Sequence, residues 1–168
     1  MKRPLALLIL AVAICASGAT AYALTASAPA TARKATVSLH KTRLGKVLVD
    51  SRGRTLYLFM KDARRKSRCG AGCASAWPPL RTNARPRAGA GVNARRLGSI
   101  RRGDGARQVT YFGHPLYRFI GDAGPGDTQG QNVREFGARW YAVKASGRHV
   151  PAGAPKPQAT PPPYPTGY

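Results

Sequence analysis

The sequence predicts a mainly β fold in which two related hairpin-based repeats form one small β domain. The phrase Leu-Tyr-x-Phe-x-x-Asp occurs at 56–62 and again at 116–122, a spacing of 60 positions. Each copy follows a β-prone run and a short turn that contains glycine, which is the pattern of a β-hairpin. A further β-prone run at 139–143 follows the second copy. These observations together favour a duplicated β unit.

The elements follow in order within a predicted domain of residues 35–146. In the first repeat, at about 44–80, we expect a hairpin formed by the β-prone runs 46–50 and 54–59. In the second repeat, at about 107–143, we expect the equivalent hairpin from 108–112 and 116–119. Between the two hairpins, the segment Cys69-x-x-x-Cys73 is predicted to form a short helical turn.

The repeated motif has a physical interpretation on a strand. Residues two apart on a strand share a face, so the Tyr and Phe of each copy are predicted core anchors that bury a large aromatic area. Each Asp falls just beyond its strand, where a carboxylate can accept backbone N–H bonds and shape a turn. A ligand platform made by these aromatic side chains is the alternative. The six motif residues are Tyr57, Phe59, Asp62, Tyr117, Phe119 and Asp122.

The composition is strongly basic. The 168 residues include 28 Lys+Arg and 6 Asp+Glu, which gives a net charge of +22. Such density favours contact with polyanions, and the candidate anion-binding residues are Arg64, Arg65, Lys66 and Arg68. Specific nucleic-acid binding is not predicted, because aromatic residues are not interleaved with the arginines apart from Trp77 and no nucleic-acid-binding motif is present. Anionic wall polymers or membrane lipids are the expected partners, and a merely solvated basic surface is the alternative.

The N-terminus has the pattern of an export signal. Lys2 and Arg3 precede an apolar run at 5–14, and small residues follow it, which predicts a signal peptide at 1–23. The run is shorter than the roughly 20 residues of a spanning helix. We expect a linker at 24–34 and a proline-rich, disordered tail at 147–168.

Cys15 leaves two possibilities for the mature N-terminus. Residues 12–15 resemble a bacterial lipobox, in which this cysteine would carry a lipid. Ile14 stands where that signal needs a small residue. We therefore favour a cysteine inside a discarded signal peptide, with an exported, envelope-associated product.

Cys69 and Cys73 are predicted to form a disulfide, because their number is even in an exported chain. A redox or metal-handling site that uses these cysteines, with Met60 or His114, is the alternative. Four oxygen-bearing side chains in the second repeat raise the question of a calcium site, but their spacing does not match an EF-hand loop; they are Asp122, Asp127, Gln129 and Asn132. We predict no catalytic residues, no metal and no cofactor.

Several of these features together resemble a known family. The two motif copies, the stretch Cys69-x-x-x-Cys73-x-x-x-Trp77-Pro-Pro, the turn at 113–115 and the closing Trp140-Tyr141 are similar to those of a bacterial secreted-repeat family of predicted lipoproteins. The similarity covers most of residues 44–143. It implies an exported module whose biochemical role is unassigned, and it transfers no catalytic residue.

Overall fold

The structure, a computed structural model, describes residues 34–153. Contacts divide the chain into two units, Met1–Ala30 and Thr31–Tyr168, and every described residue belongs to the second unit. The predicted signal peptide at 1–23, Cys15, and the greater part of the predicted linker and tail lie outside the described residues. Within residues 34–153, no helix is both long enough and apolar enough to cross a membrane.

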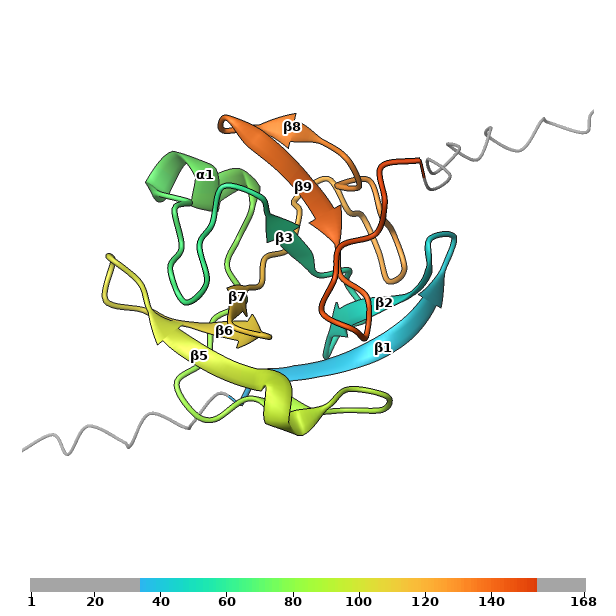
Figure 1. Cartoon of the computed structure of the whole chain (residues 1–168), viewed down its shortest axis with the longest axis horizontal. Coiled ribbons are helices and arrows are strands. Elements are labelled where there is room, and N and C mark those ends of the chain that lie inside the picture. Colours follow the sequence, from blue (N-terminus) through green and yellow to red (C-terminus); the bar gives the residue numbers. More distant parts are fainter. Residues whose placement is uncertain (1–33, 154–168) are drawn as a thin grey trace, which may run out of the picture. The chain divides into compact units, whose positions relative to one another are not determined.

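The described chain is mainly β, with three small sheets, as the sequence predicted (Figure 1). A short helix, α1 (Ala71–Ala76), forms at the cysteine segment, also as predicted, and a 3-10 turn, η1 (Ala94–Arg96), precedes the second repeat. The strands are β1 (Thr36–Thr42), β2 (Gly45–Asp50), β3 (Tyr57–Phe59), β4 (Arg87–Ala88), β5 (Leu97–Arg101), β6 (Arg107–Tyr111), β7 (His114–Pro115), β8 (Arg134–Glu135) and β9 (Ala138–Ala142).

Each repeat is built on one antiparallel hairpin. β1 pairs with β2 in the first repeat, and β5 pairs with β6 in the second. The hairpin expected between 46–50 and 54–59 is present only near its turn, where Val49 and Thr55 form an isolated bridge. The hairpin expected between 108–112 and 116–119 is also present near its turn, as the short β6–β7 ladder. The sequence predicted that 46–50 and 108–112 each pair with the run that follows. In the structure, each forms its longer ladder with the preceding strand, β1 or β5. The repeats therefore begin earlier than residues 44 and 107.

The motif strand of each repeat pairs with the other repeat. β3 is antiparallel to β9, which places Phe59 opposite Trp140. The Met60 N–H donates to the Arg139 carbonyl at 3.0 Å, and in the other half the Ile120 N–H donates to the Ala76 carbonyl at 3.1 Å. The repeats thus exchange equivalent strands about an approximate twofold axis.

The axis passes between Tyr57 and Tyr117. The Tyr57 N–H donates to the Tyr117 carbonyl at 2.8 Å, and the Tyr117 N–H donates to the Tyr57 carbonyl at 3.1 Å. An unpaired backbone group in the core would be costly, so these reciprocal bonds fix how the two motif strands face each other. The same residue of each repeat therefore lies at the centre of the unit.

The motif strand is buried on both faces, which explains why the phrase is almost continuously apolar. Tyr57 and Phe59 belong to one core cluster, with Trp77. Leu56 and Leu58 point the other way into a second cluster. Burial of this kind is the main stabilising contribution to a small domain. The strand therefore connects the two halves of the core.

The fold continues beyond residue 146, where the predicted tail was to begin. The Val150 side chain is 1% exposed, and its N–H donates to the Ala142 carbonyl at 2.8 Å. Val143 and His149 form a further bridge. A buried valine with a paired backbone belongs to the core, so this part of the tail assignment is corrected to place 147–150 in the domain.

Candidate functional site

The repeated motifs meet at the centre of the unit and exchange hydrogen bonds. The Tyr57 hydroxyl donates to Asp122 Oδ2 at 2.8 Å, and the Tyr117 hydroxyl donates to Asp62 Oδ2 at 2.7 Å. Each tyrosine thus binds the aspartate of the other repeat rather than its own. A hydrogen bond to a charged group contributes more than a neutral one, so the two pairs hold the repeats together.

Asp122 lies in the drier of the two environments. Asp122 is 8% exposed. Burial raises the pKa of Asp122 to about 6, with a smaller upward effect from the nearby Asp127. The Tyr57 hydroxyl and the Gln129 N–H, which donates to Oδ1 at 2.8 Å, act against this rise. Burial and the adjacent Asp122 also raise the pKa of the Tyr57 hydroxyl. This phenol stays protonated and serves as a donor.

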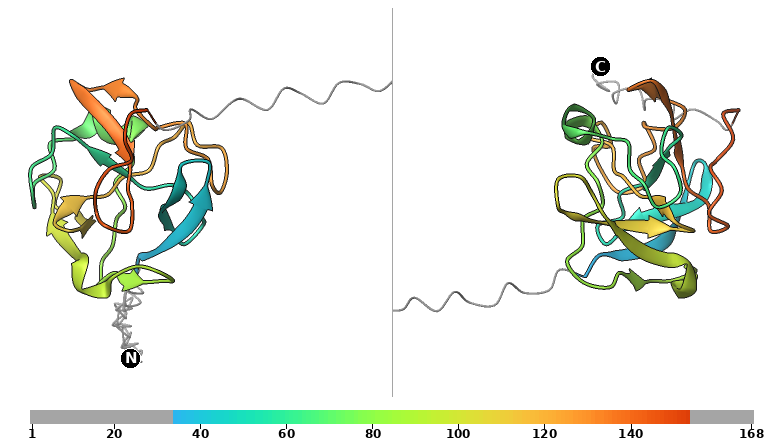
Figure 2. Two further views of the ribbon diagram at one scale, coloured as in Figure 1. Left: turned by 45° about the vertical axis from the view of Figure 1, so that its right-hand side comes forward. Right: turned by 60° about the vertical axis from the view of Figure 1, so that its left-hand side comes forward.

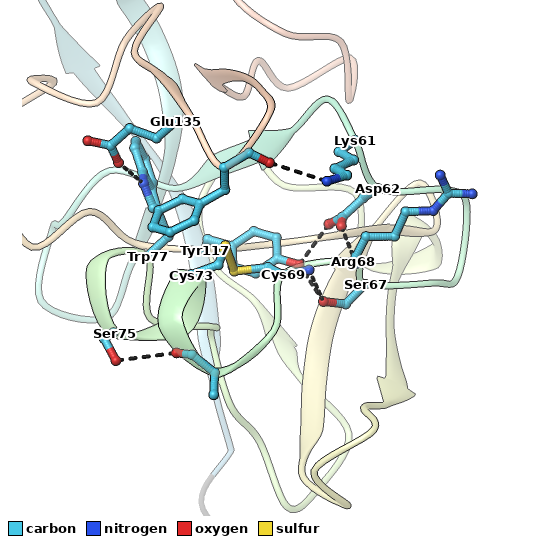
Figure 3. Close-up of a disulfide and its surroundings, with 12 residues drawn as sticks. Lys61, Asp62, Ser67, Arg68, Cys69, Cys73, Ser75, Trp77, Tyr117 and Glu135 are labelled. Carbon is cyan, nitrogen blue, oxygen red and sulfur yellow. Dashed lines mark hydrogen bonds between the residues drawn. A yellow bond between two sulfur atoms is a disulfide. The ribbon is translucent and has the colours of Figure 1, made fainter.

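Asp62 has cationic neighbours. Its Oδ1 accepts the Arg68 N–H at 2.6 Å, and its partner Tyr117 also contacts the Ser67 hydroxyl at 2.8 Å (Figure 3). The buried Arg102 guanidinium donates to Ser67 Oγ at 2.8 Å. Burial raises the pKa of Asp62, whereas the Arg68 N–H, Tyr117 and the charge of Arg102 counteract that effect. The two carboxylates of the motif therefore differ in surroundings although their tyrosine bonds match.

Four aromatic rings form a continuous stack across the axis. Phe59 stacks on Trp140 with centroids 4.2 Å apart, Trp140 on Trp77 at 4.0 Å, and Trp77 on Phe119 at 4.2 Å. Trp77 donates its indole N–H to Glu135 Oε2 at 2.7 Å (Figure 3). Both tryptophans are fully buried, and Phe119 is partly buried. The stack therefore fills the core.

Cys69 and Cys73 form the predicted disulfide, with Cα atoms 5.2 Å apart. Both residues are buried, at 3% and 6% exposed. Met60 and His114, the further residues of the redox or metal alternative, line a cleft whose walls include neither cysteine. Within residues 34–153, no group of three or more His, Cys, Asp or Glu side chains is placed to hold a metal ion.

Three of the four side chains considered for calcium have an oxygen atom that accepts a hydrogen bond from the protein itself. Asp122 accepts the Tyr57 hydroxyl, as described above. Asp127 Oδ2 accepts the Gly124 N–H at 2.8 Å, and Asn132 Oδ1 accepts an Arg139 N–H at 2.8 Å. These side chains therefore shape the loop of the second repeat.

The basic cluster at 64–68 lies in the turn between β3 and α1. Its four cationic side chains are exposed. The Arg65 N–H donates to the Gly113 carbonyl at 2.7 Å, which fixes the cluster beside the turn of the second repeat. Burial, with the charge of Arg64, lowers the pKa of His114 in that turn. The structure thus places the predicted anion-binding residues on one exposed turn, close to both repeats.

The sequence prediction missed three further sites of concentrated charge. In each of three hairpins, near the turn, two exposed cations face one another across the strands. Like charges directly opposite each other weaken strand pairing. Knowledge of the hairpin register would have revealed these cation pairs from the sequence. The pairs are Lys41 with Lys46, Arg101 with Arg107, and Arg134 with Arg139.

The acidic side chains bind groups other than these cation pairs. All six acidic residues lie in the described part of the chain, and each has a polar partner there. Asp50 binds Arg54 at 2.7 Å, and Asp104 lies 3.3 Å from Arg81. The other four bind tyrosine, tryptophan or backbone donors, and they are Asp62, Asp122, Asp127 and Glu135. The acids therefore organise the interior and the loops.

The fold and its centre define a tandem-repeat β module with exchanged motif strands. The chain belongs to the family described as a secreted repeat of unknown function, whose model matches residues 38–81 and 98–144, more than half of the chain. This confirms the resemblance noted in the sequence, and membership makes the protein an exported one. Neither the curated proteins nor the solved structures include a match.

Proposed function

We propose that this exported module binds a flexible, phosphate-rich polymer of the cell envelope. The observation that carries the proposal is the set of three exposed cation pairs at the hairpin ends, with the basic turn at 64–68 as a fourth patch. A bound polyanion supplies the negative charge that these pairs lack.

Two cations directly opposite each other destabilise a hairpin, and the position of these residues in the fold does not account for that cost. Opposite-charge or β-branched partners at the same positions would stabilise the hairpins. A residue arrangement that weakens the fold but sits on the surface is typical of a binding role, because sites are often built at the expense of stability. Release of counterions from a neutralised polyanion gives such binding its strong salt dependence.

The arrangement of the patches favours a polymer over a flat bilayer. The turns of the β1–β2, β5–β6 and β8–β9 hairpins point away from one another (Figures 1 and 2). A planar surface can touch one such edge at a time, whereas a flexible chain can wrap around several. Contacts made at several patches of one polymer also add avidity.

A binding experiment with matched variants tests this proposal. The probe is a purified phosphodiester wall polymer, measured by sedimentation with the protein across a salt series, with phosphatidylglycerol vesicles as the comparison. The Lys41→Gln/Lys46→Gln variant removes one pair. The Arg52→Gln/Arg95→Gln variant is the control, because it removes the same charge from two exposed residues that do not face each other.

The expected result is binding of the wild type that weakens steeply as salt rises. We expect the pair variant to lower the slope of log K against log salt by about 1–2, since each lost phosphate contact removes about 0.7–0.9 from it. The control variant should lower this slope less. The free energy of unfolding of the pair variant should equal or exceed that of the wild type. Equal binding by all three proteins, or binding to vesicles alone, contradicts the proposal.

A further inference from the structure

A cleft of about 540 Å³ lies where the two repeats meet the C-terminal loop. Its volume is within the roughly 300–1,000 Å³ that small-ligand sites occupy. Leu58, Phe59 and Met60 come from the first repeat, His114 comes from the second, and Lys144 and Arg148 come from the loop that follows β9. Side chains from three separate segments therefore converge on one hollow.

Part of the cleft lining is apolar. Phe59 is 3% exposed and is held in place by its stack on Trp140, whereas the neighbouring Met60 is 47% exposed. Met60 is one of few large apolar side chains that the described residues leave open to water. A flexible thioether next to a fixed ring is a surface that can adapt to an aliphatic chain.

The cleft also has a cationic part, which comes from a loop with a fixed backbone. The Lys144 N–H donates to the Arg148 carbonyl at 2.9 Å, which closes a tight loop. Gly147 in that loop has a φ of 79°, and a Cβ there would clash with the Phe112 ring, so the loop packs closely on the second repeat. The loop backbone that carries the two cations is therefore fixed, which lowers the entropy lost on binding.

The cleft also contains one carboxylate, that of Asp62, but its charge is already engaged. Asp62 accepts the Tyr117 hydroxyl and the Arg68 N–H. The cations Lys144 and Arg148 therefore dominate the charge of the cleft lining, and the charge of Arg64 acts on His114, another lining residue. A metal cation would be repelled here, whereas an anion is attracted.

Comparison of the two repeats shows that residues lining the cleft differ from their equivalents in the other repeat. Met60 corresponds to Ile120 and His114 to Arg54, each 60 positions apart. Arg54 binds Asp50 at 2.7 Å, so an internal ion pair takes the position that His114 has in the cleft. The motif residues match between the halves, while the cleft residues differ.

We propose that this cleft binds a small amphiphilic anion, with its aliphatic chain on Phe59 and Met60 and its carboxylate or phosphate head group on Lys144 and Arg148. This goes beyond polymer binding, which uses the hairpin ends. The chemistry requires both parts of the ligand: the apolar chain leaves water, and the head group forms charge-assisted hydrogen bonds.

The structure provides two probes of occupancy. The sequence contains methionine only at positions 1 and 60, so a ¹³C-methyl-methionine label gives a Met60 signal that a Met60→Leu variant identifies. Trp140 lies directly behind Phe59, so tryptophan fluorescence reports the same site. The full chain is titrated with dodecanoate and dodecyl phosphate below their micelle concentrations, and with dodecanol, dodecyltrimethylammonium and acetate.

We expect both anionic amphiphiles to shift the Met60 methyl signal, and acetate and the cationic amphiphile to leave it unchanged. Shortening the chain should weaken binding about fourfold for each methylene removed, the value for one buried CH₂. Preference between dodecanoate and dodecyl phosphate identifies the head group. Dodecanol, which lacks the charge, should bind at least about tenfold more weakly than the anions.

The Lys144→Gln/Arg148→Gln variant should weaken binding about tenfold or more, since each charge-assisted hydrogen bond is worth about that factor. Arg52→Gln/Arg95→Gln, which removes the same charge from exposed residues outside the cleft, should bind like the wild type. An unperturbed Met60 signal, or equal binding by the Lys144/Arg148 variant, would overturn the proposal. Neither outcome bears on polymer binding, which is measured separately.

Discussion

The two repeats share a motif but place it in different surroundings. Tyr57 binds Asp122 in a dry site, and Tyr117 binds Asp62 beside Arg102 and the Arg68 N–H. The hydrogen bonds are nearly equal in length, at 2.8 and 2.7 Å. The Tyr–Asp exchange is therefore the common element, and the environment around each pair was free to diverge.

The segment between each motif aspartate and its tryptophan shows the same divergence. In the first repeat it contains the Cys69–Cys73 disulfide and α1. In the second it contains Gly130, where an added Cβ would lie 2.8 Å from both the Trp77 and Tyr57 rings. One repeat uses a covalent link to shape this segment, and the other uses close packing on a glycine. Four comparisons between the halves follow from this contrast.

The largest expected difference concerns the outer rings of the aromatic stack. Phe59→Ala should cost about 3–5 kcal/mol, because Phe59 is only 3% exposed and its removal opens a cavity beside Trp140. Phe119→Ala should cost less, about half as much, since Phe119 is only partly buried and its site can relax into solvent. Urea unfolding of the two variants measures both values. Equal losses would mean that the two ends of the stack are equally enclosed.

Tyr57→Phe and Tyr117→Phe should separate the two Tyr–Asp pairs. Loss of the Tyr57 hydroxyl leaves a buried Asp122 with one donor fewer, a change worth up to about 3 kcal/mol. Loss of the Tyr117 hydroxyl should cost about 1 kcal/mol, because Asp62 keeps the Arg68 N–H and Ser67 keeps Arg102. Thermal unfolding tests the order, and a larger loss for Tyr117→Phe would contradict it.

Removal of the disulfide should loosen the first repeat more than the second. The Cys69→Ser/Cys73→Ser variant should lose about 2 kcal/mol of global stability, the value expected for a very small closed loop. Because the repeats unfold together, amides that exchange by global unfolding should exchange faster in both repeats by that amount. Amides of 63–76 should exchange faster still through local opening, and an equal further increase in 123–133 would contradict this difference.

The last comparison concerns the dependence of stability on pH. Burial raises the pKa of Asp122 to about 6, whereas the unfolded chain releases this proton near the ordinary value of about 3.9. A raised pKa means that the folded state holds the proton longer, so this contribution is present below about pH 4 and is lost as the pH rises through about 6. Asp122→Asn should remove that decline from urea unfolding curves recorded between pH 4 and 7, and Asp62→Asn should remove less. An identical decline in Asp122→Asn would assign it to another group.

The sequence was sufficient for the fold class, the duplicated unit and the disulfide, because each depends on local pattern. Alternation and turn residues identify strands, and two cysteines four positions apart can meet with little chain movement. The partner of each strand was not predictable in the same way. The motif strand is apolar on both faces, so nothing in its pattern selects β9 over its own neighbour.

The Tyr–Asp hydrogen bonds between the two repeats could not be predicted from the sequence, for a related reason. Tyr57 has two chemically identical acceptors to choose from, Asp62 and Asp122, and only the three-dimensional approach of the repeats selects the second. Two of the cation pairs were missed because they depend on the register of hairpins whose first strands, β1 and β5, were placed outside the predicted repeats. The third depends on the short β8–β9 hairpin, which was not predicted. Once that register is known, the pairs follow directly.

The central claim is that the repeats form one cooperative unit through exchanged motif strands, and native-state hydrogen exchange tests it most directly. The N–H groups of Tyr57, Met60, Tyr117 and Ile120 each donate to a carbonyl of the other repeat. We expect all four amides to exchange with one free energy, equal to that of global unfolding from urea. If the amides of either repeat open at a distinctly lower free energy than those of the other, the two repeats are separate folding units and the account is wrong.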